Sequence, residues 1–318
     1  MIFYTRKFQC LLTTSRRILL GVMLGVILML PAPEATAQRK DDRGAGRRYE
    51  KIKLRKINPG FKPRPEKYPP GEELVYMLKW TTIPAGQGRI RIAEKRKKIN
   101  GTPCFHVTTT AVSNKFVSMF YPVKDKVESF IDASRLCSVR YVKRLRENKY
   151  KRDEKIDFDY EKKTAHYFKH VHGKKKVSKE VSIPGPIQDP LSALFYLRNF
   201  NLKVGTTFAI RLHTGGKNWT GHVDVLKKGV KRIRLHGAYE AFQIEIRGSF
   251  EGIFVHKDKS LKVWVEKHSK IPISAHAELP FGSINISLVQ FKNTCMKPIQ
   301  LHRFGRKARK KRAERNKR

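Results

Sequence analysis

Acidic side chains are scarce in this sequence relative to basic ones. Its 318 residues include 27 Asp and Glu against 69 Lys and Arg, so the formal net charge is +42. This balance argues against cationic partners and favours anionic ones, such as lipid phosphates, acidic polysaccharide or nucleic acid. A solvated basic surface without a specific partner has the same composition, because net charge informs on solubility and association and not on fold.

Cysteine is also scarce, and no two cysteines stand in a CxxC pair. The absence of that pair argues against thiol redox chemistry. Cys104, Cys137 and Cys295 follow the N-terminal segment that contains Cys10. In an oxidising compartment these three allow one disulfide and one remaining thiol. Buried free cysteines, which pack as small hydrophobes, are the alternative.

The motifs of common catalytic centres are missing. Ser, His and Asp are all present, but neither GxSxG nor HExxH occurs, and no recognised nucleic-acid motif is found. Asp125 and Glu128 form an acid pair that general acid–base work could use, although ion pairs with Lys or Arg are the simpler interpretation on so basic a chain. We therefore predict no catalytic residue, no cofactor and no specific nucleic-acid binding.

Three histidines, His166, His170 and His172, fall on one face if their segment is a strand. Three imidazoles on one face can bind zinc or copper. Lysines bound this short segment, and no carboxylate or cysteine stands beside the histidines. The sequence therefore predicts a solvated strand face here and no metal site.

What the sequence does contain is an export signal. Arg6, Lys7, Arg16 and Arg17 precede the apolar run Ile18–Leu30, and Ala35-Thr36-Ala37 has the small residues that a signal peptidase needs. The run is short for a membrane span, so we expect cleavage near Ala37 and a periplasmic protein of a bacterial envelope. An uncleaved anchor is the alternative, and the paired arginines leave the choice between the general and twin-arginine export routes open.

Composition divides the rest of the chain into three parts. Residues 38–70 are basic and then rich in proline, which predicts a disordered or extended linker. Residues 71–292 read as one β-rich domain, and residues 293–318 as a disordered basic tail. The tail residues expected to contact an anionic surface are Arg306, Lys307, Arg309, Lys310, Lys311 and Arg312.

One helix stands out among many short strands. In the stretch from Asp189 to Asn199, Asp189 suits the N-cap and Pro190 the first helical position, and the residues after them are apolar on most sides. Glu73–Trp80 alternates with strand period, and Asn100-Gly101 predicts a hairpin turn. We expect a mainly β fold, a strongly curved antiparallel sheet or open barrel wrapped around one buried helix.

The segment from Ser113 to Pro122 breaks the strand pattern. It carries four large apolar or aromatic side chains that we expect to face a partner surface. They are Phe116, Met119, Phe120 and Tyr121.

Several segments together resemble a bacterial envelope family, the domain of unknown function 3108, over about residues 71–288. The residues that carry the resemblance are Gly71-Glu72-Glu73-Leu74-Val75-Tyr76, Trp80, Ile83-Pro84-Ala85-Gly86, Phe120-Tyr121-Pro122-Val123-Lys124-Asp125, Glu128-Ser129-Phe130, Arg146-Glu147, Tyr150, Asp189-Pro190-Leu191-Ser192-Ala193-Leu194-Phe195-Tyr196-Leu197-Arg198, Gly205, Val263-Trp264-Val265, Ile271-Pro272 and Phe281-Gly282-Ser283. The resemblance implies a signal peptide and no established activity.

These observations lead to a functional hypothesis, a non-catalytic envelope protein that binds an anionic or amphipathic lipid or polymer, with peripheral membrane contact. An apolar interior facing the helix is expected to hold the ligand, lined by Tyr76, Leu78, Trp80, Leu194, Phe195, Leu197 and Trp264. The alternatives are an envelope hydrolase without a recognisable motif and a structural protein attached to anionic polymer through its tails.

Overall fold

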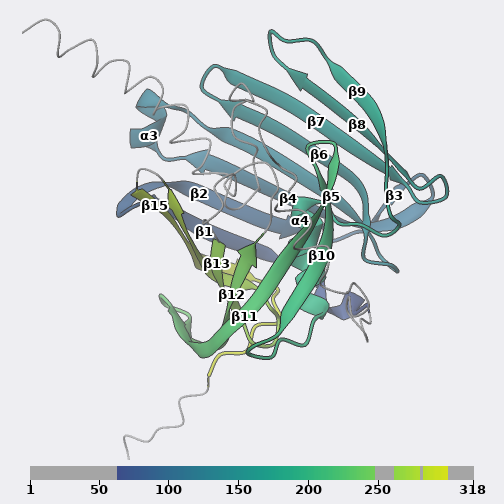
Figure 1. Cartoon of the computed structure of the whole chain (residues 1–318). Coiled ribbons are helices and arrows are strands. Elements are labelled where there is room, and N and C mark those ends of the chain that lie inside the picture. Colours follow the sequence, from purple (N-terminus) through teal and green to yellow (C-terminus); the bar gives the residue numbers. More distant parts are fainter. Residues whose placement is uncertain (1–62, 248–260, 280–281, 300–318) are drawn as a thin grey trace, which may run out of the picture.

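The computed structural model describes residues 63–247, 261–279 and 282–299. These residues form a mainly β protein, with 15 strands in one antiparallel sheet (Figure 1). The strand order is β10-β11-β12-β13-β14-β15-β1-β2-β4-β5-β6-β7-β8-β9, and β3 pairs with β4 beside this path. The sheet is strongly curved but not closed, because β9 and β10 stand at its two ends.

The bounds of the strands are β1 Glu73–Trp80, β2 Ile83–Ile92, β3 Lys97–Ile99, β4 Thr102–Ser113, β5 Lys124–Asp132, β6 Ser138–Glu147, β7 Tyr150–Asp159, β8 Thr164–Val171, β9 Val177–Ser182, β10 Thr207–Thr214, β11 Lys217–Ile233, β12 Gly237–Arg247, β13 Leu261–Glu266, β14 Pro272–Leu279 and β15 Gly282–Lys292. Strand β11 is long and continuous, with a shift of register opposite β12 between Val225 and Lys227.

Consecutive strands are joined by tight turns where the sequence allows a left-handed backbone. Asn100 and Gly101, between β3 and β4, have φ values of 48° and 79°. Asn148 has a φ of 49° in the two-residue turn between β6 and β7. Asn and Gly tolerate this conformation better than other residues, so the turn signals in the sequence fix the register of the strands on either side.

Helices interrupt the sheet at two places, and each is short. Helix α3, Lys115–Phe120, connects β4 to β5, and helix α4, Pro190–Tyr196, continues into the 3-10 helix η3, Leu197–Asn199. Together α4 and η3 cover the stretch in which the sequence predicts a helix. Five of the seven α4 residues are buried, and the helix contacts β5 and β10. Among the described residues, no helix has the length and apolar character needed to cross a membrane.

Both segments that the sequence predicts to be disordered were given bounds that include residues of the folded domain. At the end of the linker, Pro65–Lys67 forms the 3-10 helix η2, and Tyr68 is only 1% exposed. At the start of the tail, Met296 packs against the core and the Ile299 N–H donates to the carbonyl of Ala238. The sequence prediction failed because the buried ring of Tyr68 and the partly buried side chain of Met296 hold short segments that have no apolar period.

The two ends of the sheet approach each other although no ladder joins them. Gln188 and Leu212 of β10 form an isolated parallel bridge. The Asn218 side chain, on β11, donates to the carbonyl of Ser182 at the end of β9, at 2.7 Å. The barrel-like curvature is therefore held at this seam by isolated hydrogen bonds.

Candidate functional site

Helix α4 begins at a carboxylate whose two oxygens have different partners. Asp189 Oδ1 accepts hydrogen bonds from the backbone N–H groups of Leu191 and Ser192, each at 2.8 Å. Its Oδ2 accepts from the hydroxyls of Ser129 on β5, at 2.6 Å, and of Ser138 on β6. Burial raises the pKa of this carboxyl, against the hydrogen bonds that favour its ionised form. The predicted N-cap is confirmed, and the same carboxylate ties the helix to the sheet.

The other end of the helix is held by a buried ion pair. Arg198 in η3 donates two hydrogen bonds to the carboxylate of Glu72, at 2.9 and 2.7 Å. Its guanidinium also lies 4.3 Å from the ring centroid of Phe195. The Tyr68 hydroxyl donates to the Phe195 carbonyl at 2.8 Å, and the amide nitrogen of Asn199 donates to that hydroxyl at 2.9 Å. A bidentate pair has little freedom of orientation, so both ends of the helix have fixed positions.

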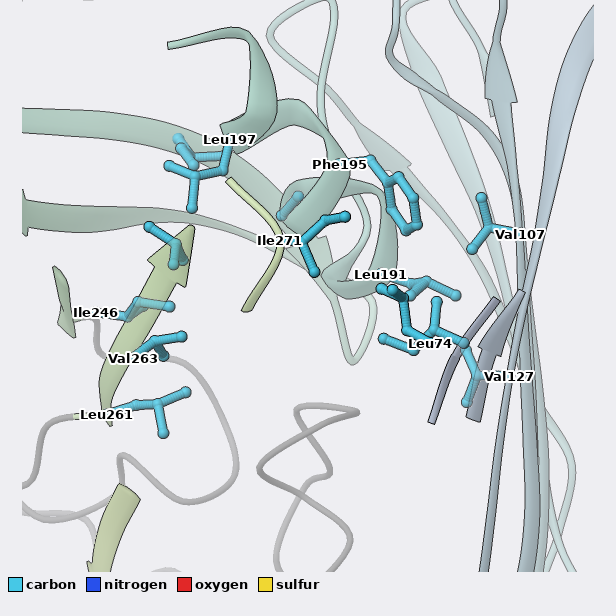
Figure 2. Packing of buried hydrophobic residues seen from close by; sticks show 14 of the residues in the cluster. Leu74, Val107, Val127, Leu191, Phe195, Leu197, Ile246, Leu261, Val263 and Ile271 are labelled. Carbon is cyan, nitrogen blue, oxygen red and sulfur yellow. The ribbon is translucent and has the colours of Figure 1, made fainter. Parts of the chain in front are cut away.

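The side chains of the helix point to two different parts of the interior (Figure 2). Leu191 lies beside Leu74 and Val127, and Phe195 faces Val107. These residues are all less than 3% exposed, which is normal close packing. Leu197 points the opposite way, toward a second set of side chains that stand apart from the helix in Figure 2. They are Ile246, Leu261 and Val263.

An apolar cavity lies on this second side. The cavity has a volume of about 50 Å³, and the empty space rises to about 680 Å³ only when the open mouth is included. The walls come from α4, η3, β1, β2 and β12 to β15, and all but a few of the lining side chains are apolar. Tyr76 contributes a hydroxyl that already donates to the Pro272 carbonyl at 3.0 Å, and Ser274 contributes another.

Three of the seven predicted interior residues line this cavity, namely Tyr76, Leu194 and Leu197. Leu78 and Phe195 are each 1% exposed and belong to the close-packed core, outside the cavity lining. Trp80 is half-buried at the end of β1 and packs against the same core.

Trp264 does not face the cavity. Its neighbours Val263 and Val265 do, and successive side chains of a strand point to opposite faces. The Trp264 ring lies instead under the ammonium groups of Lys231 and Lys227, at 4.6 and 5.8 Å from its centroid. The expectation that Trp264 lines the interior is therefore wrong for this structure, because the register of β13 turns it outward.

The remaining walls were missed by sequence reasoning. They come chiefly from β12 to β15, where apolar residues alternate with polar ones. Those that line the cavity are Ile244, Ile246, Leu261, Val263, Val265 and Ile286. The alternation was a usable signal for one buried face, but it did not show which distant strands would share that face.

The interior beside β5, β6 and β7 contains a buried polar cluster among apolar core side chains such as Tyr141 and Ile156. Lys143 and Glu154 have side chains that are 0% exposed, with Nζ and Oε2 3.4 Å apart. Arg152 also pairs with the same oxygen of Glu154. Each of these three residues has a buried nitrogen or oxygen without a hydrogen-bond partner within the described part of the chain. A buried polar network is costly unless satisfied, so these groups define a second distinct environment.

Asp125 and Glu128 lie on opposite faces of β5 and do not form an acid pair, and the ion-pair interpretation is confirmed for Glu128. Glu128 faces outward and pairs with His106 at 3.0 Å and with Arg144 at 2.8 Å. Asp125 is 1% exposed and has Glu147, 5% exposed, as its carboxyl neighbour. Burial and this proximity raise the pKa of Glu147 to about 8, and burial raises the pKa of Asp125 to about 6.

The histidine segment does not gather ligands. His166 is exposed on β8 near the Ser178 hydroxyl, at 3.3 Å, and the rings of His170 and His172 are 6.4 Å apart. Within the described ranges, no group of three or more His, Cys, Asp or Glu side chains could hold a metal ion. Cys104 and Cys137 are buried free thiols, and Cys295 is an exposed one. Burial raises the pKa of Cys104 to about 11, which makes it a poor nucleophile.

Residues 75–289 match the family described as "Protein of unknown function (DUF3108)". This chain belongs to the DUF3108 family. The match covers β1 to β15 and therefore includes both interior environments. No curated protein matches this DUF3108 chain.

Two solved structures are similar to this DUF3108 protein at low sequence identity. One is a β-barrel-like protein of the domain of unknown function DUF1849 from Brucella abortus, with 11% identity and a TM-score of 0.47, covering 70% of this chain and 97% of that one. Another is a hypothetical protein from Chlamydia trachomatis, with 9% identity and a TM-score of 0.31, covering 76% of this chain and 98% of that one.

The predicted export signal, with cleavage near Ala37, and the six basic tail residues from Arg306 to Arg312 lie outside the described residues. Export, cleavage and anionic binding by the tail therefore stay predictions from the sequence.

Proposed function

We propose that this DUF3108 protein is exported to the periplasm and binds an amphipathic, anionic envelope component without catalysing a reaction. The sheet curves around α4, and the ligand's apolar chain occupies the cavity between α4 and β12 to β15. The observation that carries the proposal is that this cavity is apolar and partly unfilled, whereas the opposite side of the same helix is close-packed. Ligand sites are typically concave and mostly apolar, with few polar groups.

Charge supports an anionic head on the ligand. The chain has a formal net charge of +42, so anionic lipids or polymers are concentrated near its surface at low ionic strength. The cavity itself offers few polar partners, because the Tyr76 hydroxyl is already bonded to Pro272. The apolar chain therefore enters the cavity, and the charged head stays at the basic surface.

The size of the cavity sets a condition on binding. Sites for small organic ligands commonly have volumes of roughly 300–1,000 Å³. The empty space of about 680 Å³ falls in that range only with the open mouth included, and the cavity without its mouth, about 50 Å³, is far smaller. Binding therefore requires the ligand to part the walls. Leu194, half-buried on the helix, is one of the side chains that form these walls.

A fluorescent fatty-acid probe tests the proposal. Leu194→Trp fills the cavity, so probe affinity should fall by roughly tenfold or more while the fold is kept. Val204→Trp is a matched control, because Val204 is 54% exposed and outside the cavity lining. The expected result is weak binding by the first variant and wild-type binding by the second.

Leu194→Asn provides the second measurement. In a ligand cavity it should lower probe affinity with modest loss of stability, whereas in a closed core a buried amide without partners costs several kcal/mol. The carrier proposal fails if wild-type protein binds no probe and Leu194→Asn unfolds. Mass spectrometry of small molecules that copurify with the protein would name the natural ligand.

The carboxyl pair favours a second candidate, an envelope hydrolase. Two neighbouring carboxyls with pKa values of about 6 and 8 have the split expected of a general acid and base. Asp125 and Glu147 are only 1% and 5% exposed, however, so a polymer reaches them only after a movement of the domain. Loss of a measured hydrolytic activity in Glu147→Gln, with probe binding unchanged, would favour the enzyme.

A further inference from the structure

Helix α3 presents an apolar face to the outside. Phe116, Met119 and Phe120 are 60%, 71% and 62% exposed, among the highest values of any large apolar side chains described. Their spacing of three and four residues places them on one side of the helix, where the rings of Phe116 and Phe120 meet edge to face with centroids 5.7 Å apart. The predicted exposure is confirmed for these three residues, but not for Tyr121, which is partly buried and packs against the core.

The opposite side of α3 is tied to the sheet. Asn114 caps the helix by accepting from the Val117 N–H at 2.8 Å, and its side-chain nitrogen donates to the Pro84 carbonyl at 2.7 Å. The hydroxyls of Ser113 and Ser118 are 2.6 Å apart and bonded to each other. These contacts fix the rotation of the helix, so the three apolar side chains cannot turn into the core.

Further apolar and basic groups surround this face. Ile83, next to the Pro84 that α3 contacts, is 48% exposed. Lys115 is the first residue of the helix, Lys124 begins β5 just after it, and both are exposed. Lys149 is exposed in the β6–β7 turn, whose Asn148 N–H donates to the carbonyl of Pro122 just after the helix. We call Ile83, Phe116, Met119, Phe120 and these three lysines the α3 tip; Figure 1 places α3 at the ends of β4 and β5, at the periphery of the sheet.

We propose that the α3 tip docks the protein on an anionic lipid membrane. Phe116, Met119 and Phe120 enter the boundary between headgroups and acyl chains, and the lysines contact lipid phosphates. An apolar face edged by lysines is the pattern of interfacial anchors, in which burial and attraction to anionic lipid add. The lysines complement lipid phosphates in charge. A stable protein partner would need an interface of roughly 800 Å² per side, which is far more than the surface of a helix of one and a half turns. Docking uses none of the cavity residues, so it stands whether or not the cavity binds a ligand.

Vesicle cosedimentation tests the docking, with protein recovered after export and the N-terminus matched between variants by intact mass. The vesicles are phosphatidylcholine alone or phosphatidylcholine with phosphatidylglycerol. A variant with Phe116→Ser, Met119→Ser and Phe120→Ser should lose roughly a hundredfold in partitioning onto the anionic vesicles. The matched control carries Val204→Ser, Val230→Ser and Leu235→Ser, which remove three exposed apolar side chains elsewhere and should leave partitioning unchanged.

Two further variants separate the contributions within the tip. Lys115→Glu with Lys124→Glu should weaken binding to the anionic vesicles by roughly tenfold and leave the weak binding to phosphatidylcholine alone unaffected. Phe120→Trp should show a blue shift of its added fluorescence on binding, which reports insertion even if the triple variant is unstable. Wild-type partitioning by the triple variant, or a Phe120→Trp emission that vesicles leave unchanged, would show that other charges carry the binding and would overturn the proposal. Absence of vesicle binding by the wild-type protein would do the same and would favour a protein occupant of the tip.

Discussion

The interior beside β12 to β15 and the interior beside β5 to β7 belong to one sheet, but their side chains differ in kind. The first contains Ile, Leu and Val around an incompletely filled space. The second contains Lys143, Arg152 and Glu154, with the Asp125–Glu147 carboxyl pair near them. Helix α4 touches the apolar cavity with Leu194 and η3 touches it with Leu197, while the N-cap carboxylate of α4 is bonded to Ser129 and Ser138 of β5 and β6.

The difference shows which half of the interior can tolerate a change in the groups that fill it. An apolar space can be emptied or filled at a cost set by lost dispersion and transfer energy, and a ligand chain restores both. Charges in the polar half need fixed partners at all times, because an unpaired buried ion costs several kcal/mol. The polar half therefore acts as a fixed frame, and the ligand exchange proposed above would involve the apolar half alone.

The largest expected effect comes from breaking the polar frame. Glu154→Leu leaves the buried cations Lys143 and Arg152 without their shared carboxylate and should lower the free energy of unfolding by about 3–5 kcal/mol. Lys143→Met should cost less than half as much, because Glu154 keeps Arg152 and because burial already lowers the pKa of Lys143 to about 8. Urea unfolding of both variants measures the difference, and equal costs would contradict the assignment of Glu154 as the hub.

The second comparison is between the two sides of α4. Leu191→Ala removes a side chain that is 2% exposed in the close-packed side and should cost about 3 kcal/mol. Leu194→Ala enlarges a space that is already unfilled and should cost about 1 kcal/mol. Urea midpoints at constant m-value give both numbers. If the two substitutions were equally damaging, the cavity side would be as tightly packed as the other.

A smaller effect appears as a pH dependence of the polar half. The folded protein raises the pKa of Glu147 from 4.5 to about 8 and that of Asp125 from 3.8 to about 6, so it holds protons that the unfolded chain releases. Their stabilising contribution is present below about pH 4 and is lost as pH rises through about 8. Glu147→Gln should flatten the fall in stability between pH 5 and 8, and an unchanged slope would exclude the pair as its source.

The smallest effect belongs to the outer face. Lys231→Ala removes the ammonium that lies 4.6 Å from the Trp264 ring and should cost about 0.5 kcal/mol, since cation–π contacts at exposed sites are weak. Fatty-acid probe binding should not change, because Trp264 does not line the cavity. Lower probe affinity in this variant would return Trp264 to the ligand site.

Local signals in the sequence were sufficient for the elements of the fold. Asp189 and Pro190 predicted the start of α4, and Asn100-Gly101 predicted a turn, because caps and turns depend on a few adjacent residues. The face of a strand is harder to predict, and Trp264 and Asp125 show why. Which face of a strand is buried depends on the pairing register, and a shift of one residue reverses every side chain.

The polar half could have been anticipated in part. The two-residue turn Asn148-Lys149 fixes the β6–β7 register, which pairs Lys143 with Glu154 directly. What the sequence could not show is that this face of the hairpin points inward, since charged residues occur on both of its faces. The cavity walls include strands that lie more than a hundred residues apart in the sequence, such as β1 and β12. A pattern within a short stretch of sequence cannot show that such distant strands meet.

The open sheet has a consequence for how copies of the protein behave toward one another in solution. Strand β9 ends the sheet with side chains that are mostly exposed, Lys179 among them, and Lys174, Lys175 and Lys176 directly precede it. Sheet edges recruit further strands from other molecules unless something repels them, and edge lysines are a common deterrent. Part of the large positive charge is thus explained without any ligand. These lysines hinder other copies of the protein from pairing with an edge that the fold does not close.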